Sequence, residues 1–171
     1  MTDQTATTIR EAIAANPMGA LEDVARAAGV PTREVLENLP DGQAHCAPGA
    51  AFVDIMQEMT GWGDVTFIVN TPEVIAEVKG PVPAGNLKNG FYNLHGGPLS
   101  GHLRAGNCAI IAFVERKFMG IDTMSVQFYA ESGACMFKVY LGRDAARQLI
   151  PGQITAFRAA RDRFAGAPAD A

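Results

Sequence analysis

Cysteine is scarce in this chain, whose 171 residues include only Cys46, Cys108 and Cys135. Their number is odd and their spacing is wide, so they form neither a CxxC redox motif nor a zinc knuckle. Cys108 and Cys135 lie in apolar stretches, where a free cysteine acts as a small hydrophobic side chain. We therefore expect three reduced thiols and no thiolate metal site.

The chain also lacks a strong charge of one sign and long apolar runs. The net charge is −4, with acidic and basic residues mixed along the chain, which leaves no broad basic surface for nucleic acid. The first eight residues are polar, unlike a secretory signal. Since the longest apolar runs are far shorter than the roughly twenty residues of a membrane helix, we expect a cytoplasmic protein with no nucleic-acid partner and no membrane insertion.

Several catalytic signatures are missing as well, including a glycine-rich phosphate loop, a GxSxG elbow and an HExxH motif. Ser100 and His102 are two residues apart and would share one side of a strand. A hydrolase would further need an orienting group and an oxyanion hole, and the sequence places neither.

Three short helical patterns begin the chain, at residues 8–15, 21–28 and 32–39, and Gly29 can end the second. Residues 23–35 resemble a helix-turn-helix, which would make the protein a DNA-binding regulator. The recognition helix would carry one arginine against two glutamates, a poor match for phosphates. We therefore interpret the three helices as a small helical cap and keep the regulator as an alternative.

One more helix and then a series of strands are expected. Residues 41–49, rich in Gly, Pro and Ala, predict a linker, and residues 51–59 an amphipathic helix. Residues 65–69 are β-branched and aromatic, which is typical of a strand. Further strands, joined by turns that favour antiparallel hairpins, are predicted at residues 73–79, 86–94, 102–104, 108–114, 125–129 and 135–141.

Two helices are expected after the strands, at residues 145–149 behind a capping Asp144 and at residues 153–164. Residues 166–171 are expected to be a disordered tail. These elements predict a single α+β domain: a helical N-terminal cap over residues 1–49, then a large antiparallel sheet with C-terminal helices over residues 50–165.

The candidate chemistry gathers in residues 91–104, a segment punctuated by glycine. It holds His95 and His102, and histidine is the side chain that is aromatic, largely neutral and metal-ligating near pH 7. Tyr92 can stack on a ligand, and Arg104 offers a planar fork for a carboxylate. The segment predicts a ligand-binding edge on the sheet, although each histidine on its own also fits a structural or surface role.

Six short segments follow one another in a distinctive order and spacing. They are NLHG at 93–96, GHL at 101–103, NCAIIA at 107–112, RKFMG at 116–120, SVQFY at 125–129 and MFKVYLGR at 136–143. Together they resemble the HutX/ChuX-type family of cytosolic haem utilisation carrier proteins. The resemblance runs from residue 9 to residue 164 and is densest between residues 64 and 143.

The resemblance implies a haem-utilisation fold and a cytoplasmic carrier, not an enzyme, that binds haem b and passes it to a haem-degrading or storage partner. It also implies a homodimer that resembles one chain of the larger two-repeat haem-degrading relatives. An enzyme that degrades haem on the same fold is the nearest alternative. The family's Gly-His-Leu histidine falls on His102, which becomes the leading candidate for the iron ligand.

One position departs from the family pattern. The family can carry a histidine after Ile-Val at the end of the first strand, where this chain has Asn70, and an amide is a poor iron ligand. Tyr129 is the first substitute, because a phenolate suits ferric haem. Behind it stand His95, Tyr92 and Met119.

A porphyrin needs an apolar slot, an axial donor and a cation for its propionates. Phe91 and Phe128 are expected to form the slot, His102 to supply the donor and Arg104 the cation. A single ligand on a sheet face that is partly open to water would let the haem be released.

Overall fold

The computed structural model describes residues 3–166, and these form nine β-strands in two sheets. The larger sheet has the order β1-β7-β8-β9-β2-β3, and all of its neighbouring strands are antiparallel. Its strands are β1 (Ala44–Pro48), β2 (Asp64–Asn70), β3 (Ile75–Pro81), β7 (Cys108–Phe118), β8 (Ile121–Ala130) and β9 (Cys135–Tyr140). The smaller sheet joins β4 (Gly85–Lys88), β5 (Phe91–Leu94) and β6 (Gly101–Leu103). The predicted α+β fold with a large antiparallel sheet is confirmed.

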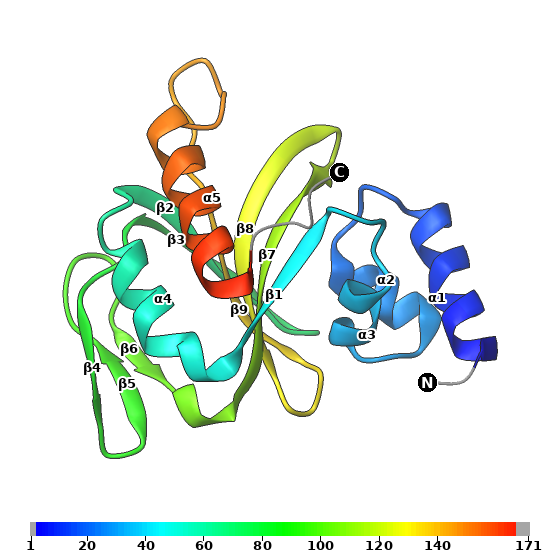
Figure 1. The fold of residues 1–171 in the computed structure, drawn as a ribbon, viewed down its shortest axis with the longest axis horizontal. Coiled ribbons are helices and arrows are strands. Elements are labelled where there is room, and N and C mark those ends of the chain that lie inside the picture. Colours follow the sequence, from blue (N-terminus) through cyan, green and yellow to red (C-terminus); the bar gives the residue numbers. More distant parts are fainter. Residues whose placement is uncertain (1–2, 167–171) are drawn as a thin grey trace.

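The larger sheet carries an apolar core on each face. Three N-terminal helices cover one face: α1 (Asp3–Ala15), α2 (Leu21–Ala28) and α3 (Thr32–Glu37). The other face is covered by the smaller sheet and two helices, α4 (Phe52–Met59) and α5 (Pro151–Ala165). Figure 1 shows the blue N-terminal helices on one side of the strands, with cyan α4 and red α5 on the other. Neighbouring residues of a strand therefore enter different cores.

An aromatic cluster fills the core beneath the smaller sheet. Phe128 stacks on Phe137 with ring centroids 4.2 Å apart, and Phe52 of α4 meets Phe128 edge-on at 5.1 Å. Offset and edge-on ring contacts of this kind stabilise a core beyond the area that they bury. The smaller sheet is thereby held at a defined place on the larger one.

The predicted linker at residues 41–49 is wrong, because residues 44–48 form β1 at the edge of the larger sheet. His45 and Cys46 pair with Phe113 and Ala112 of β7. Alanine and proline have weak strand propensity, so only the exposed hydrogen-bonding edge of β7 makes this segment extended. Pro48 is tolerated because it ends an edge strand. The short helices η1 (Gly49–Ala51) and η2 (Ala105–Asn107) complete the connections.

Two further predictions are wrong. Residues 86–94 are not one strand but the hairpin of β4 and β5, which turns at Asn89 and Gly90 with φ of 54° and 79°; positive φ at both central residues is typical of a type I′ turn. Residues 145–149 are not helical, since Asp144 and Gln148 close a loop of hydrogen bonds there. The predicted tail lies, from residue 167 on, outside the described residues.

The three N-terminal helices are confirmed, with α1 starting at Asp3. In a helix-turn-helix protein, α3 would be the recognition helix. Its N-terminal end packs against the β8–β9 turn, where the backbone N–H of Arg33 donates a 3.0 Å hydrogen bond to the Gly133 carbonyl. The Arg33 side chain pairs with Glu37 at 2.7 Å. The first turn of α3 and its arginine thus both make contacts within the protein.

Candidate functional site

Strands β5 and β6 place three of the polar and aromatic side chains of residues 91–104 on one outward face. Asn93 pairs with His102, and the pair Tyr92 and Leu103 is the next one along. Because paired residues share a face and neighbours alternate, Phe91, Asn93 and His102 point away from the core. His102 is exposed and Asn93 is half-buried.

Contacts on this outward face hold the side chains in place. His102 Nδ1 lies 2.7 Å from Asn93 Oδ1, and the His102 ring meets the Phe91 ring edge-on with centroids 5.9 Å apart. The Arg104 guanidinium carbon lies 4.7 Å from the Phe91 ring centroid, a cation–π contact that holds the side chain over the ring. An imidazole, an aromatic ring and a guanidinium thus form one row on an exposed surface, which fits a flat ligand that has a metal and carboxylates.

Tyr92 lies on the opposite, inward face of the smaller sheet. It is fully buried in the core and packs edge-on against Phe52 at 5.7 Å. Burial raises the pKa of the Tyr92 phenol. The side chain therefore anchors the smaller sheet and is not brought together with His102.

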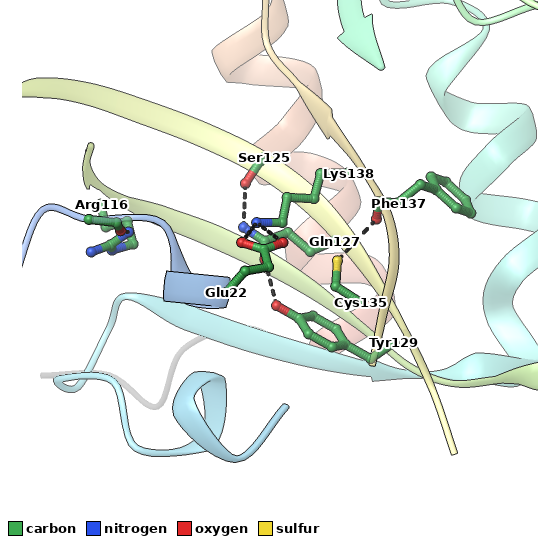
Figure 2. A network of polar contacts seen from close by, with 9 residues as sticks. Glu22, Arg116, Ser125, Gln127, Tyr129, Cys135, Phe137 and Lys138 are labelled. Carbon is green, nitrogen blue, oxygen red and sulfur yellow. Dashed lines mark hydrogen bonds and ion pairs between the residues drawn. The ribbon is translucent and has the colours of Figure 1, made fainter. Parts of the chain in front are cut away.

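Tyr129 lies in the other core, beneath the N-terminal helices (Figure 2). It is fully buried, and its hydroxyl donates a 2.6 Å hydrogen bond to Gln127, whose amide donates to Ser125 at 2.9 Å. Burial raises the pKa of this phenol well above its ordinary value. The phenolate that would bind iron is therefore disfavoured, and the structure does not support Tyr129 as a haem ligand.

The remaining candidates occupy separate places. His95 is exposed in the loop between β5 and β6, and Phe128 belongs to the central aromatic cluster. Asn70 and Met119 border a hollow of about 1270 Å³ between α2, β2, β3 and the β7–β8 hairpin. None of the described residues of β4–β6 lines this hollow, so the Asn70 position and His102 belong to different surfaces of the chain.

A buried ion pair, which the sequence analysis missed, joins the helical cap to the sheet next to Tyr129. Lys138 Nζ lies 2.7 Å from both carboxylate oxygens of Glu22 (Figure 2), and their side chains are 5% and 11% exposed. Burial by itself lowers the pKa of Lys138, but the acidic groups around it, Tyr140, Cys135 and Glu22, hold it above the ordinary value. The sequence signal for this pair was Lys138, a charged residue in the middle of an otherwise apolar strand. Because lysine is almost never buried without a partner, such a position indicates a buried ion pair.

The described residues include no group of three or more His, Cys, Asp or Glu side chains that could hold a metal ion. Across residues 3–166, no helix is both long and apolar enough to span a membrane.

Comparison with known proteins gives close matches. The intracellular heme transport protein HutX of Vibrio cholerae is 38% identical over 128 residues, which span 74% of this chain and 66% of HutX. A crystal structure of a protein from Erwinia carotovora is 44% identical with a TM-score of 0.87, covering 91% of this chain and 98% of that one. The crystal structure of ChuX is 40% identical with a TM-score of 0.83, covering 91% and 96%.

A more distant neighbour shares the fold alone. The structure of ChuS, an Escherichia coli haem oxygenase, is 13% identical with a TM-score of 0.73, and the match covers 90% of this chain but 48% of ChuS. The family model for the haem utilisation proteins ChuX/HutX matches residues 45–160, which include all nine strands except the first residue of β1. On this match and the identity to HutX, the chain belongs to the ChuX/HutX family of haem utilisation proteins.

Proposed function

We propose that this protein is a cytoplasmic carrier that binds haem b on the outward face of β5 and β6 and releases it to an acceptor. The observation that carries the proposal is the row of His102, Phe91 and Arg104 on one exposed face. Membership of a haem utilisation family supports haem as the ligand. HutX is named a heme transport protein and ChuX a heme-binding protein, which supports haem transport over enzymatic haem degradation.

Each residue of the row has a role in this proposal. The imidazole of His102 is the axial donor to the iron, and Arg104 pairs with a propionate through its planar fork. Phe91 lies between them and packs against the porphyrin. His95, exposed in the neighbouring loop, is the second candidate for a ligand, whereas buried Tyr92 and Tyr129 have no part in the site.

The exposure of this face favours release. A haem on an open sheet face keeps one side accessible, so an acceptor can approach it before the bond to His102 breaks. We propose a haem-degrading or storage protein as the acceptor. We also propose a homodimer, because this chain matches half of ChuS, whose single chain has room for two such units.

A titration with ferric haem, followed in the Soret region, tests the proposal. The wild-type protein should give a saturable shift, and His102→Ala should weaken binding at least about tenfold, since the iron loses its protein donor. His45→Ala, a histidine on β1 of the larger sheet, is the matched control and should bind as the wild type does. A saturable shift unaffected by His102→Ala but lost in His95→Ala would move the ligand, and no saturable wild-type shift would refute haem binding.

The same samples separate a carrier from a haem-degrading enzyme. With a reductant and oxygen, the Soret band of a carrier complex should persist. Steady loss of the band with formation of a defined bilin would favour degradation on the shared fold.

A further inference from the structure

Asn93 makes two kinds of hydrogen bond at the centre of the outward face. Its amide nitrogen donates to three backbone carbonyls, those of Phe91 at 3.1 Å and of Asn86 and Lys88 at 3.2 Å each. Its amide oxygen lies 2.7 Å from Nδ1 of His102. The amide thus joins the β4–β5 hairpin to the imidazole on β6.

The three carbonyls decide which way round the amide lies. Carbonyl oxygens only accept hydrogen bonds, so the end of the Asn93 side chain that faces them must be the NH₂ group. The oxygen therefore faces His102, and an amide oxygen also only accepts. The hydrogen bond can form only if His102 Nδ1 carries the proton.

In a neutral imidazole, one ring nitrogen carries the proton and the other has a free lone pair, and the hydrogen bond of the first nitrogen sets this choice. A proton on Nδ1 leaves the lone pair on Nε2. Among the described residues nothing donates to Nε2 of His102, and the side chain is exposed. Phe91 supports the ring edge-on, so the imidazole is held from two directions.

We infer that Asn93 is a positioning residue that fixes the Nδ1–H tautomer of His102 and so presents Nε2, with its lone pair, outward to a metal. Metal-bound histidines generally donate their other ring N–H to an oxygen acceptor, which orients the ring and raises its basicity. This inference rests on the proposed function for the identity of the metal, since haem iron is what Nε2 would bind. The tautomer itself is a property of the protein without haem.

The first test is nitrogen NMR of the imidazole ring in the haem-free protein at about pH 8.5, above the ordinary titration range of histidine. The wild-type His102 signals should be those of the Nδ1–H tautomer. In Asn93→Leu, which has no oxygen acceptor, the signals should shift toward the Nε2–H tautomer that free histidine prefers. A wild-type Nε2–H tautomer would overturn the inference, even if Asn93→Leu failed to fold.

The second test measures haem affinity and the rate of haem transfer to apomyoglobin. Asn93→Leu should bind haem about 10- to 100-fold more weakly, as is usual when an oxygen that orients a ligating histidine is removed. Asn16→Leu is the matched control, because Asn16 is an exposed asparagine just after α1, away from β4–β6, and it should behave as the wild type does.

The outcomes distinguish the inference from the proposed function. Absence of a saturable haem shift in the wild type refutes the proposed function, while the tautomer of the haem-free protein still decides the inference. If haem binds through His102 but Asn93→Leu and Asn16→Leu have equal tautomers and equal transfer rates, Asn93 is not a positioning residue.

Discussion

Removal of the Glu22 carboxylate on α2 should strongly destabilise the protein. Glu22 reaches from the helical cap to Lys138 on β9, and Lys138 Nζ contacts both of its oxygens at 2.7 Å. With a lysine side chain that is 5% exposed, little water is available to take over from the carboxylate. In Glu22→Ala, the ammonium group of Lys138 would be left buried without a counter-ion.

The size of the effect follows from this burial. Breaking a buried pair by removing one partner typically costs about 3–5 kcal/mol, because the remaining charge is uncompensated. Asp23 and Arg26, on the same helix, form a pair at 2.8 Å whose side chains are 57% and 62% exposed. An exposed pair of this kind contributes less than about 1 kcal/mol, so Asp23→Ala is the matched control.

Urea unfolding of the two variants, followed by circular dichroism, gives the comparison. We expect Glu22→Ala to lose about 3–5 kcal/mol of unfolding free energy and Asp23→Ala less than about 1 kcal/mol. The double variant Glu22→Leu with Lys138→Met should recover most of the loss, because a buried ion pair can be replaced by apolar side chains of similar volume. Equal losses in the two single variants would refute the argument from burial.

Three further predictions concern the thiols and the glycines. Burial raises the pKa of Cys108 to about 11 and that of Cys135 to about 12 from an ordinary 9.0. The folded protein therefore keeps thiol protons that the unfolded chain loses, so the free energy of unfolding measured in urea should fall as the pH rises above 9.0. An unfolding free energy that does not change with pH would contradict this. Cys46 is the exposed cysteine and should be alkylated first by iodoacetamide, as peptide mass spectrometry would show; faster modification of Cys135 would count against its burial. Gly133→Ala should lower the free energy of unfolding by about 1–3 kcal/mol more than Gly120→Ala does. Both glycines have positive φ, but an added Cβ at Gly133 would come within 2.6 Å of Pro31, whereas one at Gly120 meets open space. Equal melting temperatures of the two variants would contradict this packing.

Strong local patterns allowed much of the fold to be predicted. The apolar and β-branched runs of residues 65–69 and 108–114 indicate strands because their composition alone disfavours helices, and both form strands in the structure. The spacing of Ile154 and Phe157 indicates the helix α5 in the same way. Weak local patterns did not suffice: β1 is extended because β7 offers it a hydrogen-bonding edge, and no residue within β1 encodes that edge.

The residues of the candidate site also fall into those that the sequence identifies and those that only the packing places. A family resemblance in the sequence singles out His102, and local chemistry singles out Arg104. Alternation along a strand shows that Phe128 and Tyr129 face opposite ways, but it cannot show which core covers each face. Only the packing of the helical cap reveals that Tyr129 is buried beside an ion pair.

The amide of Asn93 is the clearest case of a role that the sequence does not reveal. Asn93 and His102 are nine residues apart, and nothing in their spacing indicates that they meet. Their contact depends on the register of β5 with β6, and the direction of the amide depends on three carbonyls that the β4–β5 hairpin brings together. The sequence determines which side chains are available to bind a metal-containing molecule. The tertiary structure decides which of them are exposed, oriented and adjacent, because hydrogen bonds and burial arise between segments that are distant in the chain.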